Sequence, residues 1–198
     1  MKWKIILLIG IVAFIGIFLY KEYNKEEAYP LPDEDQMQTL LNNEVNADKS
    51  VLGDQIGLSA GQTPPDFELN TLTEGNFQLR DYKGKKVVLN FWASWCPPCR
   101  AEMPDMQKFH EDYQKDGVEI IAVNLTSAER NEENIQKFID EFNIDFTIPL
   151  DISGEVGGTY GAFSIPTSYL LNRDGTIHQK IIGPMTYQWL EQEIEKMH

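Results

Sequence analysis

Cysteine and histidine are scarce in this sequence, which has two cysteines and three histidines among 198 residues. A structural zinc site typically uses about four such ligands, and His110, His178 and His198 do not have the spacing of a zinc finger. A purely structural disulfide is also a weak interpretation, because the two cysteines are so close together that a bridge would close too small a loop to stabilise much. The sequence therefore predicts neither a metal site nor a bound cofactor.

Basic residues are also few: 17 Lys and Arg stand against 31 Asp and Glu, for a formal net charge of −14 at pH 7. Two of those bases, Lys2 and Lys4, lie at the extreme N-terminus, so the acidic excess is larger still in the rest of the chain. Such a charge argues against binding to nucleic acid and against docking on anionic lipid headgroups. Its simplest interpretation is solubility.

One long uncharged apolar segment runs from Ile5 to Tyr20. We expect an uncleaved transmembrane anchor, because the segment exceeds the usual signal-peptide core of about 7–15 residues and no small-x-small cleavage site follows it closely. A cleaved secretory signal is the alternative. The positive-inside rule places residues 1–4 in the cytoplasm and residues from about 21 onward outside it. The sequence thus predicts a single-pass protein of the cell membrane with an extracytoplasmic catalytic domain.

The rest of the chain divides into two parts. Residues 21–61 are rich in charge, lack a persistent period and are expected to form an acidic linker or extension. Residues 62–198 alternate strand-like and helical patterns, which predicts one α/β domain with parallel central strands and helices on both faces. The expected order is a hairpin of 63–69 and 77–79, a strand at 86–91, a helix at 102–115, a strand at 118–125, a helix around 135–142, a short strand at 146–150, a helical turn at 155–160, a hairpin of 168–171 and 176–182, and a final helix near 190–197.

The two cysteines, Cys96 and Cys99, follow the apolar strand and precede the first helix of this domain. A Cys-x-x-Cys pair between a strand and a helix is typical of thiol–disulfide exchange. The first turn of a helix has unpaired N–H groups and a partial positive charge, which stabilise a thiolate. We expect Cys96 to be the exposed attacking sulfur and Cys99 the shielded sulfur that resolves the mixed disulfide. Pro97 suits the first helical turn, and Pro97 and Pro98 stiffen the spacer.

The segment 91–104, which reads FWASWCPPCRAEMP, resembles the active-site signature of membrane-anchored thiol–disulfide oxidoreductases of the TlpA/ResA type. Pro65-Asp66-Phe67, Ile165-Pro166-Thr167 and Asp174-Gly175 also fit this family, which belongs to the thioredoxin-like superfamily. The resemblance implies a thioredoxin-like fold with a central mixed sheet flanked by helices, an N-terminal β-hairpin extension and an N-terminal transmembrane helix. It also implies an extracytoplasmic reductant of client proteins that is itself reduced by a membrane thiol transporter of the CcdA type. The implied clients are oxidised apocytochrome c or proteins of spore cortex synthesis.

The resemblance also assigns roles to residues. It makes Cys96 the nucleophile, Cys99 the resolving cysteine and Glu102 the active-site carboxylate of this branch. Pro166 matches a cis-proline that faces the disulfide and, with Ile165, helps to hold the client backbone.

Ordinary thioredoxins carry an aspartate at the position of Asn90, and an amide cannot accept a proton near neutral pH. Glu102 lies one turn beyond Cys99 and can take that role; the alternative is an exposed carboxylate that merely favours the helix dipole. Trp92 and Trp95 are expected to pack around the site, with Trp95 also available to a client. We expect His110 and His178 on the surface. Thr126 and Glu129 have the spacing of a capping box for the second helix.

Other functions remain open from the sequence. The same fold serves oxidising disulfide donors, so the direction of electron flow is not fixed. A peroxiredoxin would want Thr or Ser at the position of Ala93 and a lone reactive cysteine. A copper-delivery protein would use two thiolates and a histidine, usually with a wider cysteine spacing. A non-catalytic binding module predicts that Cys96→Ser leaves the cellular role intact.

Overall fold

The computed structural model describes residues 56–72 and 75–198. The expected cytoplasmic N-terminus, the transmembrane anchor at 5–20 and most of the acidic extension lie outside these residues. Within the described ranges, no helix is long and apolar enough to cross a membrane.

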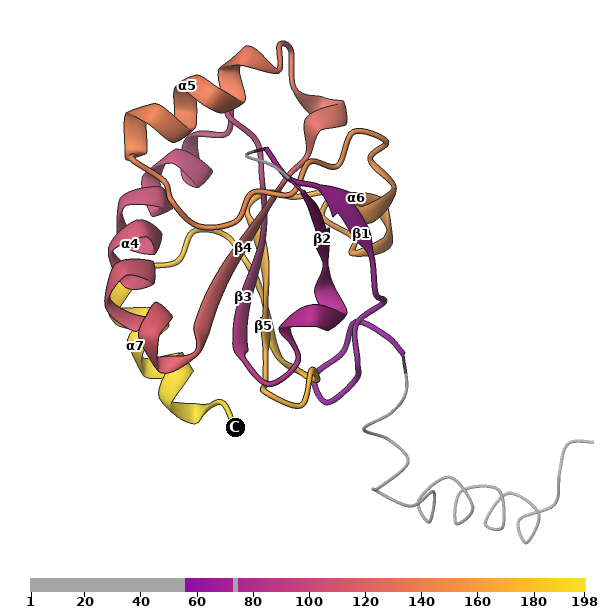
Figure 1. Cartoon of the computed structure of the whole chain (residues 1–198), viewed down its shortest axis with the longest axis vertical. Coiled ribbons are helices and arrows are strands. Elements are labelled where there is room, and N and C mark those ends of the chain that lie inside the picture. The colour runs from indigo at the N-terminus through magenta and orange to yellow at the C-terminus, as the bar shows by residue number, and fades with distance from the viewer. Residues whose placement is uncertain (1–55, 73–74) are drawn as a thin grey trace, which may run out of the picture. The chain divides into compact units, whose positions relative to one another are not determined.

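A four-stranded mixed sheet forms the centre of the domain, in the order β4-β3-β5-β6 (Figure 1). β3 and β4 are parallel, whereas β5 runs antiparallel to β3 and β6 antiparallel to β5. The predicted parallel centre and C-terminal hairpin are therefore confirmed. The bounds are β3 Lys86–Trp92, β4 Val118–Asn124, β5 Thr167–Leu171 and β6 Ile177–Ile182.

A separate two-stranded antiparallel sheet precedes this one and consists of β1 (Glu68–Asn70) and β2 (Asn76–Gln78). The 3-10 helix η1 (Leu79–Tyr82) follows directly. The short strand expected at 146–150 is reduced to isolated bridges, of which Thr147 and Leu150 each pair in parallel with a residue of β4.

The observed helices differ from the predicted helices mainly in the residue at which each begins. The first helix begins at Pro97, five residues before the expected start, because the cysteine pair itself forms its first turn. Gly117 ends the following 3-10 helix with a left-handed φ of 76°, as its position after the helical pattern predicted. The bounds are α4 Pro97–Tyr113, η2 Gln114–Asp116, η3 Thr126–Ala128, α5 Glu133–Phe142, α6 Glu155–Thr159 and α7 Tyr187–Lys196.

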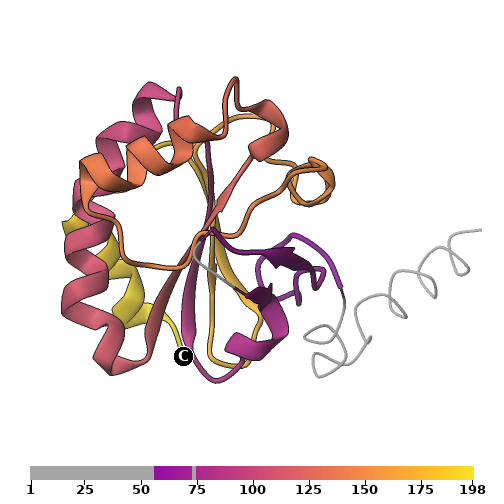
Figure 2. The same cartoon turned by 45° about the horizontal axis from the view of Figure 1, so that its top comes forward.

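The side chains of each strand alternate between two apolar cores, one on each face of the sheet. Val88 and Trp92 of β3 point into the core formed with α4, α5 and α7, while Leu89 and Phe91 point into the other. Helices were expected on both faces, yet the three long helices lie on one face and only the short α6 lies on the other (Figure 2). The second face is instead covered largely by the two-stranded sheet and η1, whose buried side chains include Phe77 and Leu79.

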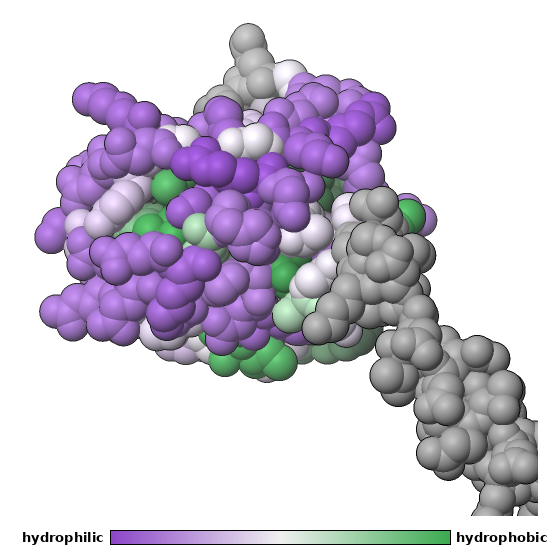
Figure 3. All heavy atoms as spheres, turned by 90° about the horizontal axis from the view of Figure 1, so that it is seen from below, coloured by the Kyte–Doolittle hydropathy of each residue, from purple (hydrophilic) through white to green (hydrophobic). Residues whose placement is uncertain are grey.

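The face drawn in Figure 3 is mostly hydrophilic, with small apolar patches. His110 departs from the expectation of a surface position, because it is only 7% exposed, with its ring edge against Phe146 and its Nε2 3.7 Å from a carboxylate oxygen of Asp145. His178 is half-buried.

Candidate active site

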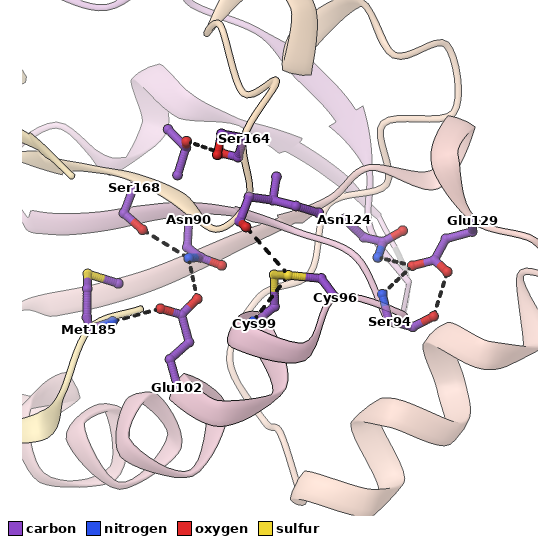
Figure 4. Close-up of a disulfide and its surroundings, with 12 residues drawn as sticks. Asn90, Ser94, Cys96, Cys99, Glu102, Asn124, Glu129, Ser164, Ser168 and Met185 are labelled. Atoms are coloured by element: carbon purple, nitrogen blue, oxygen red, sulfur yellow. Dashed lines mark hydrogen bonds between the residues drawn. A yellow bond between two sulfur atoms is a disulfide. The ribbon is translucent and has the colours of Figure 1, made fainter. Parts of the chain in front are cut away.

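The two cysteines lie where β3 leads into α4, and they are joined by a disulfide (Figure 4). Cys96 is the N-cap residue of α4, and its Sγ accepts the backbone N–H of Cys99 at 3.2 Å. Pro97 opens the helix, where its missing N–H leaves no hydrogen bond unmade. This placement at a helix N-terminus confirms the local prediction, and it favours a thiolate at Cys96 when the disulfide is reduced.

Cys96 is buried, with 2% of its surface exposed, and Cys99 is fully buried. The expectation of an exposed Cys96 is therefore wrong for the disulfide form. Its sulfur is bonded to Cys99 on one side and lies 3.7 Å from the carbonyl oxygen of Ile165 on another. The spacer prolines Pro97 and Pro98 are exposed instead.

The loop before β5 covers the disulfide. Its Ile165–Pro166 peptide bond is cis, as the family resemblance implied, and the Ile165 carbonyl oxygen lies beside Cys96 Sγ although the two residues are 69 positions apart. Ile165 is half-buried, whereas Pro166 is buried. The half-buried Ile165 of this loop can present its backbone groups to a bound polypeptide beside the reactive sulfur.

Glu102 lies one turn beyond Cys99 on α4 and is only 1% exposed. Its Oε1 accepts a hydrogen bond from Asn90 Nδ2, and its Oε2 accepts one from the backbone N–H of Met185, both at 2.9 Å. Burial raises the pKa of Glu102 to about 7, since the two hydrogen bonds oppose the desolvation only in part. The alternative of an exposed carboxylate is wrong. A group with this pKa can take up or release a proton near neutrality.

Asn90 connects Glu102 to the sheet. It lies on β3 opposite Ser168 of β5, and its Nδ2 donates both hydrogens, one to Glu102 and one to Ser168 Oγ at 2.9 Å. The side chain is fully buried. Ser168 and Met185 were not expected at the site, because neither has a sequence pattern that marks it and both reach Glu102 or Asn90 only through the tertiary fold.

A second carboxylate, Glu129, holds the turn that precedes the cysteines. It accepts the backbone N–H and the hydroxyl of Ser94, each at 2.6 Å, and the side-chain amide of Asn124 at 2.9 Å. The predicted capping box from Thr126 to Glu129 is wrong, because α5 begins only at Glu133 and the Glu129 carboxylate is occupied by Ser94. Sequence reasoning missed this contact, which joins segments 35 positions apart.

The two tryptophans of the motif have different environments. Trp92 is fully buried, donates its Nε1–H to the carbonyl of Ala122 at 3.0 Å and packs on Phe138, as a packing role predicts. Trp95 is 51% exposed, although its Nε1–H donates to the carbonyl of Ala128 at 3.0 Å. Its ring is thus anchored at the edge of the site while about half of the residue remains available to a partner.

Comparison with known proteins agrees with this geometry. A model of the AhpC/TSA family matches residues 60–180. The chain belongs to the AhpC/TSA family. Its matched region includes the cysteine pair, Glu102 and the cis-proline.

Individual known proteins are similar over most of the chain. The thioredoxin-like protein YneN of Bacillus subtilis (strain 168) is 37% identical over 195 residues, covering 98% of this chain and 97% of YneN. The thiol–disulfide oxidoreductase ResA of Geobacillus thermodenitrificans (strain NG80-2) is 38% identical over 144 residues, covering 73% of this chain and 81% of ResA. The crystal structure of StoA from Bacillus subtilis matches with a TM-score of 0.60 and 38% identity, covering 66% of this chain and 97% of StoA.

The fold, the disulfide and these relatives agree on the class of chemistry. This AhpC/TSA family member has a thioredoxin-like fold with a mixed central sheet and flanking helices, and it resembles relatives of the ResA type. It is a thiol–disulfide oxidoreductase with a Cys-x-x-Cys pair at Cys96 and Cys99.

Proposed function

We propose that this oxidoreductase reduces disulfides in specific client proteins on the extracytoplasmic side of the cell membrane. The catalytic domain is residues 62–198, with β1 and β2 as an N-terminal hairpin extension. Residues 5–20 anchor it and residues 21–61 form the acidic linker. The similarity to the thiol–disulfide oxidoreductase ResA supports disulfide exchange as the chemistry, and the apolar N-terminal segment behind Lys2 and Lys4 supports the location.

The reaction begins at Cys96 in the reduced protein. Its thiolate, stabilised at the N-terminus of α4, attacks one sulfur of the client disulfide, forms the Cys96–client bond and releases the other client sulfur as a thiolate. Cys99 then loses its proton, attacks Cys96 Sγ and breaks the bond to the client. Two electrons leave with the client thiols, and the Cys96–Cys99 disulfide remains.

Glu102 supplies the base for the second step, and its environment is the observation that carries this proposal. A carboxylate with its pKa raised to about 7 by burial, one helical turn from Cys99, can accept the thiol proton and later pass it on. Asn90 cannot do so itself, but it holds the Glu102 carboxylate through its Nδ2–H.

Ile165, Pro166 and Trp95 form the client-binding edge. The Ile165 carbonyl already lies beside Cys96 Sγ, and Trp95 presents an exposed aromatic surface next to the same residue. Trp92, Pro97 and Pro98 shape the site without direct chemistry. A membrane thiol transporter of the CcdA type returns the electrons. The clients are oxidised apocytochrome c during cytochrome c maturation, or a sporulation protein.

Trapping tests this proposal in the full chain. In Cys99→Ser the resolving thiol is gone, so we expect a stable mixed disulfide between Cys96 and the client in cells, and none with the matched Cys96→Ser control. The trapped client is then isolated, oxidised and mixed with the reduced wild-type protein, which should reduce it. If the protein instead formed disulfides in the client faster than it reduced them, the proposal would be contradicted and the protein would be an oxidising disulfide donor. Turnover of hydrogen peroxide without a client, or tight Cu(I) binding lost in His178→Ala, would mark the peroxidase or copper alternatives.

A further inference from the structure

One buried polar atom beside the disulfide has no hydrogen-bond partner: the side-chain oxygen of Asn90. The amide orientation follows from its neighbours, because Nδ2 has two hydrogens and faces two acceptors, Glu102 Oε1 and Ser168 Oγ. Turning the amide over would place its oxygen 2.9 Å from a carboxylate oxygen. Leaving a buried acceptor unsatisfied costs free energy, so this atom calls for an explanation.

Reduction of the disulfide creates a hydrogen-bond donor that the disulfide form lacks. In Figure 4 the Asn90 amide lies beside Glu102, and its oxygen is turned to the side on which the disulfide lies. Cys99, the fully buried member of the pair, has no hydrogen on its sulfur while it is bonded to Cys96. Reduction breaks that bond and leaves a thiol, which is a hydrogen-bond donor.

We propose that Asn90 Oδ1 accepts a hydrogen bond from the Cys99 thiol in the reduced protein. Asn90 is then a positioning residue that holds the resolving thiol on one side of its amide and the Glu102 carboxylate on the other. Because the hydrogen bond exists in only one redox state, it stabilises the dithiol form relative to the disulfide. The same amide that lacks a partner in the oxidised protein gains one on reduction.

The consequence for catalysis rests on the proposed roles of Cys99 and Glu102. The hydrogen bond itself does not depend on those roles. In the resolving step the Cys99 S–H bond breaks, the proton passes to Glu102, and the electron pair on sulfur forms the bond to Cys96. The Cys96–client bond breaks, and its electron pair leaves as the client thiolate. Asn90 neither gains nor loses a proton in these steps. It holds the Cys99 thiol and the Glu102 carboxylate close to each other.

The thiol–disulfide equilibrium of the full chain with dithiothreitol tests the proposal without any client. In Asn90→Leu, which is similar in size but has no amide, we expect about a tenfold shift of the equilibrium constant toward the disulfide, or about 30 mV. The matched control Ser168→Ala removes the other partner of Nδ2 but leaves Oδ1 in place, so its shift should stay below about twofold.

A repeat in the Glu102→Gln background separates this effect from an indirect one through the carboxylate. The proposal expects the tenfold effect of Asn90→Leu to persist there. An effect that disappears with Glu102, an equal effect in Ser168→Ala, or a shift toward the dithiol would overturn it. Failure of client reduction alone would not, because no client takes part.

A spectroscopic measurement does not depend on the folding of Asn90→Leu. Cys96→Ser leaves Cys99 as the only thiol in the chain, so its S–H stretching band in the Raman spectrum reports one group. We expect the band of a hydrogen-bonded thiol, which moves to the position of a free thiol when Asn90→Ala is added. A free-thiol band with Asn90 intact would refute the hydrogen bond.

Discussion

Glu102 and Asp151 are both buried carboxylates, yet their hydrogen bonds come from different distances along the chain. Asp151 is fully buried and accepts the backbone N–H groups of Gly154 at 2.9 Å and Gly157 at 2.7 Å, both from its own loop and the start of α6. Glu102 accepts its two hydrogen bonds from Asn90 and Met185, which are 12 and 83 positions away.

This difference separates a structural carboxylate from a reactive one. Asp151 accepts the hydrogen bonds of a local turn and fixes the path of the chain into α6. Its contribution is therefore to the stability of the fold. Glu102 is held where β3, α4 and the segment before α7 meet, one helical turn from the disulfide, and burial raises its pKa to about 7. Burial alone is therefore a poor sign of catalysis; the position next to a reacting sulfur and the raised pKa together indicate it.

The largest expected effect concerns the rate of reduction. Glu102→Gln removes the proposed base while preserving the size of the side chain, so resolution of a mixed disulfide at pH 7 should slow by about 100-fold. Stopped-flow measurement with a fluorescent peptide disulfide checks this. Asp151→Asn is the control, and its rate of resolution per folded molecule should stay within about threefold of the wild-type rate. Equal losses in the two variants would remove the distinction between the carboxylates.

The pH dependence of stability tests the same pKa without a client. Because the folded pKa of Glu102 is about 7 against 4.5 for the free side chain, the folded protein holds this proton more tightly. The contribution of Glu102 to stability is therefore greatest below about pH 4.5 and falls by about 3 kcal/mol as the pH rises through 7. Urea unfolding of the oxidised wild type and Glu102→Gln should give curves that diverge over this range. Parallel curves would show that the pKa is not raised.

Asp151→Asn should instead lower the free energy of unfolding by about 2 kcal/mol, because it replaces an acceptor of two buried backbone N–H groups with a mixed donor and acceptor. Urea unfolding at pH 7 measures this loss. The reduction potential should remain that of the wild type. A stable Asp151→Asn protein would mean that the loop does not depend on this carboxylate.

The smallest effect is expected at Glu129. Glu129→Gln keeps one acceptor for Ser94 but weakens the charge-assisted bonds, so the free energy of unfolding should fall by about 1 kcal/mol. Glu141→Gln, which breaks an exposed ion pair with Arg100, is the matched control and should change the free energy of unfolding less. A larger loss in the control would count against a role for Glu129 in holding the active-site turn.

The sequence predicted best what is determined locally. The position of the cysteine pair at a helix N-terminus follows from a few consecutive residues, and so does the turn at Gly117. The hairpin of β5 and β6 follows from the turn signal Asn172-Arg173-Asp174-Gly175 between two strand-like runs. The cis bond at Pro166 came from the family resemblance rather than from local physics.

Contacts between distant segments could not be predicted from single-sequence patterns. The Met185 N–H reaches Glu102, and Glu129 reaches Ser94, because the fold brings these segments together, and nothing near Met185 or Glu129 in sequence marks them. The burial of His110 has the same origin, since it depends on the segment around Asp145 packing against α4. The face on which α5 lies was also undetermined, because amphipathicity predicts a buried stripe but not the surface that covers it.

The reduction potential of the Cys96–Cys99 pair in the full chain tests the central claim most directly. Equilibration with dithiothreitol or glutathione, followed by counting of free thiols, gives the value. A reductant of client disulfides that receives electrons from a membrane donor should have a potential near that of thioredoxin, about −270 mV. A value near about −120 mV would mark a disulfide donor and contradict the proposed direction of electron flow.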